Sequence, residues 1–169
     1  METERLIIRH GNEKDAQEML SFRNSDYVLK YNAMIKADET SLMKEISSQY
    51  IMEKKADHHV IGFIGVEDDT LRYGVHSKCI SYYMNEEETH HGYMQEALQA
   101  VISDLFRKET EVVVARVFKG NEASMKLLER LGFVHEGTLR KAVMGYGNIL
   151  YDDALYSILK EEWESDKLF

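Results

Sequence analysis

The second half of the chain alternates between two periods of hydrophobic residues. Segments 79–84 (CISYYM) and 111–118 (EVVVARVF) are nearly continuous apolar runs, typical of strands buried in a sheet. Each run is followed by a segment with apolar residues at helical spacing, at 93–108 and at 123–131. Two strands that are each followed by a helix are expected to pair in parallel, because a parallel connection needs a crossover. The sequence therefore predicts a mixed α/β fold with a mixed central sheet flanked by helices.

The rest of the chain extends this pattern at both ends. Polar residues that favour helix starts, such as Asn12 and Asp38, precede segments with helical spacing. The expected elements are a strand at 5–9 (RLIIR), a helix from Asn12 to about Arg23, helical pieces over 26–55 starting at Asp38 or Thr40, strands at 59–66 and 71–75, and a final strand pair on either side of Gly145.

Composition limits the classes of protein that this chain fits. Its 169 residues suit one domain, 1–169, and the sequence has no proline or repeat that would mark a second domain. A formal charge of −9 repels nucleic-acid phosphate, and no apolar run is long enough for a membrane span. We expect a cytoplasmic protein that binds neither nucleic acid nor membrane. The acidity either suits a cationic partner or only keeps the protein soluble.

Two junctions between a strand and a helix carry candidate functional residues. Asn121 and Ser124 follow the strand at 111–118, and an N-terminal helix cap would explain both of them without any active site. Gly92 opens the helix at 93–108, where unpaired backbone amides and the helix dipole favour an anion such as pyrophosphate. A glycine at a helix start is common, so this spacing alone leaves an ordinary helix start open.

The two junctions together resemble a known family. HHGYMQEAL (90–98), ARVFKGNEASMKLLERLGFVHEG (115–137) and GNILYDDALYSIL (147–159) are similar to motifs of the GNAT superfamily of acyl-CoA-dependent N-acetyltransferases. The resemblance extends from Arg5 to Trp163 and is strongest to the ribosomal-protein-alanine N-acetyltransferase (RimJ/RimL-like) branch. It implies a sheet in which two parallel strands splay apart and admit the pantetheine arm of acetyl-CoA.

The resemblance also implies roles for individual residues. Ser124 would act as an acid toward the departing sulfur, Asn121 would bind the arm of the cofactor, and Tyr82 would line the slot. Backbone groups of the strand at 79–84 and amides of the following loop would bind the rest of acetyl-CoA. The implied cofactor-binding residues are Tyr83, Met84, His91, Gly92, Tyr93, Met94, Gln95, Glu96, Asn121 and Ser124.

The catalytic base is not evident from the sequence. Some relatives carry a glutamate where this chain has Cys79, and the usual phosphate loop has Gly or Ala where this chain has Met94. An acyl-CoA-binding module without turnover is therefore the alternative to an enzyme. His90 and His91 fit a phosphate neighbour better than a metal ion, so we expect no metal.

The chemistry of the acceptor gives a preference among amines. A lysine-type amine costs about 4.6 kcal/mol to deprotonate at pH 7, whereas an α-amine costs about 1.4 kcal/mol. Without a carboxylate base, the expected substrate is an N-terminal α-amine or a small weakly basic amine. The acidic composition keeps a spermidine-type polyamine as an alternative, and the sequence leaves room for a homodimer.

Overall fold

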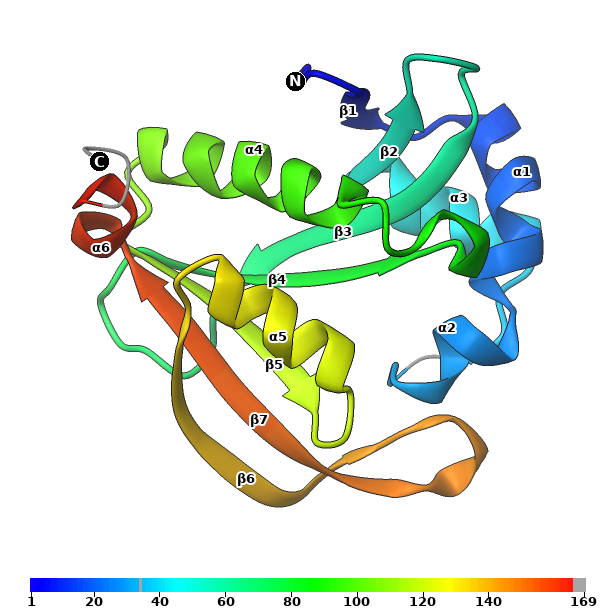
Figure 1. The fold of residues 1–169 in the computed structure, drawn as a ribbon. Helices are drawn as coiled ribbons and strands as arrows, with labels where there is room; N and C mark the ends of the chain where they lie inside the picture. The colour runs from blue at the N-terminus through cyan, green and yellow to red at the C-terminus, as the bar shows by residue number, and fades with distance from the viewer. Residues whose placement is uncertain (34, 166–169) are drawn as a thin grey trace. The chain divides into compact units, whose positions relative to one another are not determined.

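The computed structural model describes residues 1–33 and 35–165. Within them, seven strands form one sheet in the order β1-β2-β3-β4-β5-β7-β6 (Figure 1). β4 and β5 pair in parallel, whereas the β1–β2, β2–β3, β5–β7 and β6–β7 pairs are antiparallel. The predicted mixed α/β fold is confirmed. The strands are β1 (Leu6–His10), β2 (Tyr50–Lys54), β3 (Val60–Asp68), β4 (Ser77–Met84), β5 (Val112–Phe118), β6 (Val134–Met144) and β7 (Leu150–Leu159).

Six α-helices lie within the described residues, together with the short 3-10 turns η1 (Glu86–Glu88) and η2 (Tyr146–Asn148). The helices are α1 (Glu13–Arg23), α2 (Asp26–Lys30), α3 (Glu39–Ser47), α4 (Tyr93–Arg107), α5 (Glu122–Arg130) and α6 (Lys160–Ser165). The chain forms two compact units, which are described separately. The first unit contains residues 1–65, 82–100 and 145–147, and the second contains 66–81, 101–144 and the residues from 148.

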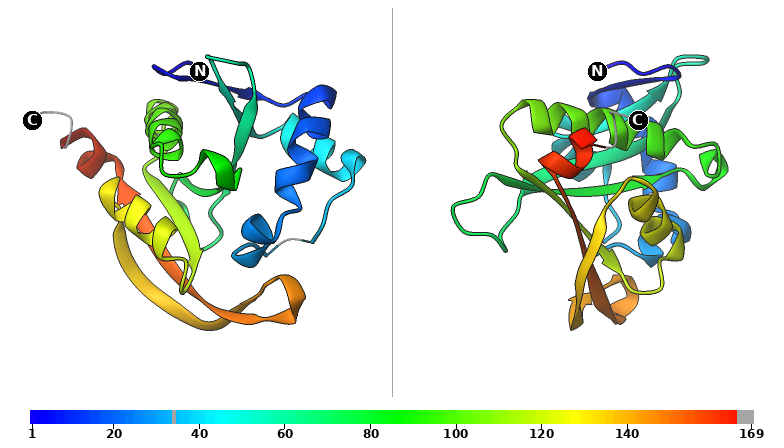
Figure 2. Two further views of the ribbon diagram at one scale, coloured as in Figure 1. Left: turned by 45° about the vertical axis from the view of Figure 1, so that its right-hand side comes forward. Right: turned by 60° about the vertical axis from the view of Figure 1, so that its left-hand side comes forward.

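The first unit has a core between its helices and the strands β2, β3 and β4. α1 begins at the predicted cap, where the Asn12 side chain accepts from the Lys14 amide and the Asp15 side chain accepts from the Asn12 amide. α1 packs beside α3 (Figure 2). Their apolar side chains meet the strands in one cluster, and its fully buried members include Ala16, Met19, Leu42, Ile46 and Ile51.

The second unit is centred on β5, which pairs with β4 on one side and β7 on the other. Val113 and Val114 are fully buried there. β6 and β7 form a long curved hairpin, with β6 at the edge of the sheet (Figure 1). α6 follows β7, and its buried Trp163 donates a hydrogen bond to Ser103 at 3.3 Å. The sequence did not predict this last helix.

Two sequence predictions about secondary structure are wrong. Residues 50–54 form the strand β2 and not a helical piece, because Tyr50 to Glu53 pair with β3 and tertiary pairing overrides the helical spacing that ended at Tyr50. Residues 71–75 form a loop and no strand. Arg72 holds this loop through ion pairs with Asp69 and Glu136, which leaves the apolar side chains of Leu71, Tyr73 and Val75 exposed.

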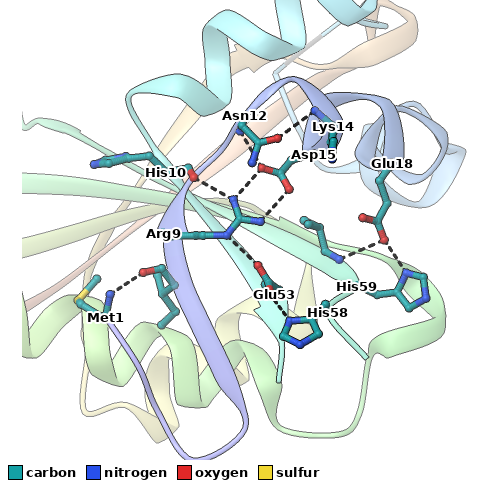
Figure 3. A network of polar contacts seen from close by, with 12 residues as sticks. Met1, Arg9, His10, Asn12, Lys14, Asp15, Glu18, Glu53, His58 and His59 are labelled. Atoms are coloured by element: carbon teal, nitrogen blue, oxygen red, sulfur yellow. Dashed lines mark hydrogen bonds and ion pairs between the residues drawn. The ribbon is translucent and has the colours of Figure 1, made fainter. Parts of the chain in front are cut away.

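The most connected polar group of the first unit is the guanidinium of Arg9 on β1 (Figure 3). It donates to both oxygens of Asp15 on α1, at 2.7 and 2.9 Å, and to Glu53 on β2 at 2.7 Å. Both carboxylates are buried. Burial alone would raise the pKa of Glu53, but hydrogen bonds from His58 and Arg9 outweigh it and lower that pKa below its usual value. Arg9 therefore joins β1, α1 and β2 through charge-assisted hydrogen bonds.

We expect Arg9→Met to reduce the free energy of unfolding by about 3–5 kcal/mol, because Asp15 and Glu53 would stay buried without their cation. Urea unfolding at pH 7 measures this loss. Arg140→Met, at an exposed position of β6, is the control and should change the free energy little. A loss in Arg9→Met no larger than in the control would contradict the role of this cluster.

Candidate active site

The loop that precedes α4 has an unusual backbone. His90 and Gly92 adopt φ values of 64° and 80°, in the region that favours glycine. A Cβ built on Gly92 would meet only the Arg5 guanidinium, at 3.5 Å, which is an ordinary contact. The backbone conformation, and not lack of space, is therefore the structural reason for glycine at this position.

The first turn of α4 presents backbone amides that precede its intrahelical hydrogen bonds. The Glu96 amide donates to the Gly92 carbonyl at 3.1 Å, which begins the helical series. The amides from Gly92 to Gln95 come before it and have no carbonyl one turn back within the helix. Their partial positive charge, added to the helix dipole, favours an anion at this end of α4.

Arg5 holds this loop from the segment before β1. Its guanidinium donates to the Glu96 carboxylate at 2.7 Å and to the His91 carbonyl at 2.9 Å, and it lies 4.5 Å above the centre of the Tyr93 ring. The Glu96 carboxylate also accepts from the Thr3 hydroxyl at 2.5 Å and the Arg5 amide at 2.8 Å. The carboxylate of Glu96 and its amide are thus both engaged in the structure of the loop.

The other predicted cofactor residues of the first unit differ in exposure. Tyr83 is buried, stacks on Phe63 with ring centroids 4.9 Å apart, and donates from its hydroxyl to Glu45 at 3.1 Å. Burial, reinforced by Glu45, raises the pKa of Tyr83 well above its usual value. Its side chain therefore belongs to the core, and only its backbone is available to a ligand. Met94 is also buried, Tyr82, Met84, Tyr93 and Gln95 are half-buried, and His91 and Gly92 are exposed.

The second unit contains the other two candidates, Asn121 and Ser124. The Asn121 side chain accepts from the Ser124 amide at 3.3 Å and caps α5. This cap uses the backbone of Ser124, which any residue would supply. Capping therefore explains Asn121, but it does not require the hydroxyl of Ser124.

Cys79 lies on β4 opposite Val114 of β5. Burial, together with the nearby charge of Asp69, raises the pKa of the Cys79 thiol to about 11. The thiol is therefore protonated at neutral pH and is neither a base nor a nucleophile there. Cys79 therefore does not replace the glutamate base that some relatives carry at this position.

One carboxylate that sequence reasoning missed lies on β7. Asp153 is 2% exposed, and Arg116 of β5 donates from Nε to its Oδ2 at 2.6 Å. Arg116 Nη2 forms an ion pair with the same oxygen at 2.5 Å. Burial raises the pKa of Asp153 above its usual value in spite of Arg116. The only signal in the sequence is the polar pair Asp152-Asp153 inside a strand that is otherwise rich in apolar residues.

Comparison with known proteins places this fold in a family. Residues 5–134 match the model of the acetyltransferase (GNAT) domain, so the chain belongs to the GNAT acetyltransferase family. It is an acyltransferase whose acetyl donor is acetyl-CoA. None of the helices in the described part of the chain has the length and apolar character of a membrane span.

Individual relatives cover nearly the whole chain. YnaD of Bacillus subtilis (strain 168), described as an uncharacterized N-acetyltransferase, is 26% identical over 95% of this chain and 97% of its own. The ribosomal-protein-S5-alanine acetyltransferase of Vibrio fischeri superposes with a TM-score of 0.82 at 20% identity, over 96% of this chain and 97% of that chain. The spermidine N-acetyltransferase of Vibrio cholerae, in complex with CoA and spermine, superposes with a TM-score of 0.80 at 16% identity, over 96% of this chain and 99% of that chain.

We expect Asn121→Ala to lower the free energy of unfolding by about 1 kcal/mol, because α5 loses its cap. Asn121→Asp is the matched control, since its carboxylate can still accept from the Ser124 amide. Thermal unfolding of the three proteins measures the difference. Equal melting temperatures for Asn121→Ala and Asn121→Asp would show that the cap contributes nothing to stability.

Proposed function

We propose that this acetyltransferase transfers the acetyl group of acetyl-CoA to a primary amine, with the pyrophosphate of the cosubstrate bound at the start of α4. The observation that carries this proposal is the set of amides from Gly92 to Gln95, ahead of the first intrahelical hydrogen bond of α4. Such amides bind anions through N–H groups and the helix dipole. Met94 and Tyr83 take part through their backbone, because their side chains are buried.

Arg5 orients this anion site without needing to touch the ligand. The carbonyl of His91 and the amide of Gly92 belong to one planar trans peptide, so they point in opposite directions. Because Arg5 binds the His91 carbonyl, the Gly92 N–H is directed away from Arg5. Glu96, held by Thr3 and by the Arg5 backbone, keeps the guanidinium in this position. Arg5 is thus a positioning residue for the pyrophosphate.

The proposed chemistry assigns a role to each candidate residue near the thioester. Asn121 hydrogen-bonds the pantetheine arm, Tyr82 lines the slot, and a backbone amide of β4 polarises the thioester carbonyl. The neutral amine attacks the carbonyl carbon, the carbon–sulfur bond breaks, and the sulfur leaves as a thiolate. Ser124, on the first turn of α5, donates a hydrogen bond or proton to that sulfur.

The acceptor is a protein N-terminal α-amine or a small amine, as in the RimJ/RimL-like branch. The superposition on a ribosomal-protein-S5-alanine acetyltransferase supports this choice, and that on a spermidine N-acetyltransferase supports a polyamine as the second candidate. Release of free thiol from acetyl-CoA tests both, with a peptide bearing an N-terminal alanine and with spermidine as acceptors. A cytoplasmic location and a homodimer stay predictions of the sequence.

We expect Arg5→Lys to weaken CoA binding about 10-fold, because lysine keeps the charge but loses the two-armed contact with Glu96 and the His91 carbonyl. Titration calorimetry with CoA measures the affinity. Pantetheine, which has no phosphate, should bind Arg5→Lys and the wild type equally.

Arg107→Lys is the control for Arg5→Lys, since Arg107 lies at the other end of α4 and 72% of its side chain is exposed. It should bind CoA as the wild type does. Unchanged CoA affinity in Arg5→Lys would refute the orienting role of Arg5, as would an equal loss for pantetheine.

We expect Ser124→Ala to lower turnover roughly 10- to 100-fold while CoA affinity stays unchanged, because a thiolate is a tolerable leaving group that needs modest assistance. Steady-state thiol release at saturating amine measures the turnover. Asn121→Ala should differ by weakening CoA binding as well. Wild-type turnover in Ser124→Ala would leave protonation of the thiolate to water and remove Ser124 from the mechanism.

A further inference from the structure

Asp153 differs from the other buried carboxylates in how its oxygens are used. Asp15 and Glu53, in the first unit, have a hydrogen-bond partner on every carboxylate oxygen. Asp153 has both contacts from Arg116 on Oδ2, and its Oδ1 is buried without a partner. Arg23 Nε is the other buried side-chain atom without a partner among the described residues. A buried acceptor left unpaired is costly, and such a group points to a ligand or a reaction.

The position of Asp153 relates it to the proposed chemistry. It lies opposite Phe118, the last residue of β5, and the Asn121 amide donates to the Phe118 carbonyl at 2.9 Å. Asp153 is therefore next to the strand end from which the Asn121–Ser124 segment begins. Tyr156, three residues later on β7, interacts with Glu129 of α5. Because side chains alternate along a strand, Asp153 faces away from α5.

The same face of the sheet carries Cys79, at the position where the sequence suggested a missing base. Cys79 pairs with Val114, and Val114 and Arg116 share a face of β5 with Phe118. The electrostatic environment of the Cys79 thiol includes Arg116 and Asp153. A carboxylate of β7 thus lies on the same face of the sheet as Cys79 of β4.

We propose that Asp153 binds the acceptor amine and acts as its general base, with Arg116 fixing the carboxylate through Oδ2 and leaving Oδ1 for the substrate. This inference rests on the proposed function, and its ligand class is a protonated primary amine. The side chain of Arg116 is 40% exposed, whereas that of Asp153 is 2% exposed. The proton reaches Oδ1 from the acceptor nitrogen directly or through one water molecule.

The proton balance of the reaction is complete with this assignment. The ammonium of the acceptor loses one proton to Asp153, and the neutral nitrogen attacks the thioester carbon. The carbon–sulfur bond breaks and its electron pair leaves with the sulfur. The nitrogen loses its second proton as the amide forms, and one proton ends on the thiolate. Asp153 returns the other proton to solvent. The acceptor and α5 lie on opposite faces of β7, so the amine and Ser124 act from different sides.

The test compares Asp153→Asn with Asp152→Asn. Asparagine retains the shape of Asp153 and an oxygen that can accept from Arg116, but it cannot take up a proton. Asp152 is adjacent on the other face of β7, where its carboxylate accepts from the Lys141 amide at 2.9 Å. Thiol release is measured with spermidine and with an N-terminal alanine peptide, beside CoA affinity and melting temperature for each protein.

We expect Asp153→Asn to lower kcat/KM for the amine by about 100-fold or more at pH 7, with CoA affinity unchanged. The defect should shrink as the assay pH approaches the pKa of the amine, about 10.4 for an alkyl amine, because the acceptor is then neutral without a base. Asp152→Asn should behave as the wild type. A purely structural role of Asp153 would give a defect that does not change with pH.

Three further outcomes would overturn the assignment. Near-wild-type kcat/KM in Asp153→Asn would remove Asp153 from the reaction while the proposed acetyltransferase activity stands. A loss of CoA affinity in parallel with kcat/KM would make its role structural. If the wild type releases no thiol with either amine, both the proposed function and the role of Asp153 fail.

Discussion

Two buried carboxylates of the first unit depend on one guanidinium. Arg9 donates to Asp15 and to Glu53, and these contacts connect the first strand to the first helix and to β2. The remaining Glu53 oxygen is taken by His58, and the Asn12 amide adds a bond to Asp15, so no carboxylate oxygen in this cluster is left unpaired. A network in which every member is satisfied rigidifies its surroundings. The edge strand β1 is held to α1 and β2 by this network.

Arg9, Arg5 and Arg116 each organise polar groups, but with different effects. Arg9 has a structural role, because its carboxylate partners Asp15 and Glu53 lie on α1 and β2 and connect these elements to β1. Arg5 is half exposed and fixes a loop carbonyl, so its effect is on the direction of a backbone amide. Arg116 holds one oxygen of Asp153 and leaves the other unpaired. The same type of side chain thus joins elements of the fold, fixes the backbone of a loop, or holds one oxygen of a buried carboxylate.

The fold could be predicted from the sequence where the hydrophobic period is long and unambiguous. The helix at 93–107, the strand at 112–118 and the final hairpin are of this kind, and the Asn12 cap is a local signal that the structure confirms. β2 was not predicted, because the helical spacing of the preceding segment continues to Tyr50 and the pairing of Tyr50 to Glu53 with β3 overrides it. The loop at 71–75 has strand-like residues, but ion pairs of Arg72 hold it outside the sheet.

The candidate site shows the same division. Gly92 and Asn121 belong to local patterns that can be found in the sequence. In the structure, a positive φ explains Gly92 and the cap of α5 explains Asn121, and neither explanation needs a ligand. Arg5 and Asp153 could not be found in this way. Arg5 is 86 residues from the carbonyl that it binds, and Asp153 is 37 residues from Arg116. Contacts at such separations depend on the pairing of strands, which one-dimensional spacing does not specify.

Asp153 changes the argument about the acceptor. The preference for α-amines was based on the absence of a carboxylate base at Cys79, since deprotonating a lysine-type amine at pH 7 costs about 4.6 kcal/mol against about 1.4 kcal/mol for an α-amine. A carboxylate beside the acceptor attracts the ammonium form, which dominates in solution, and can take up a proton as the nitrogen attacks. The formal charge of −9 acts in the same direction by drawing cations to the protein. If Asp153 is the base, the balance between the two acceptor classes moves toward alkyl amines and polyamines. Acceptor preference is then set by the shape of the site and not by the basicity of the amine.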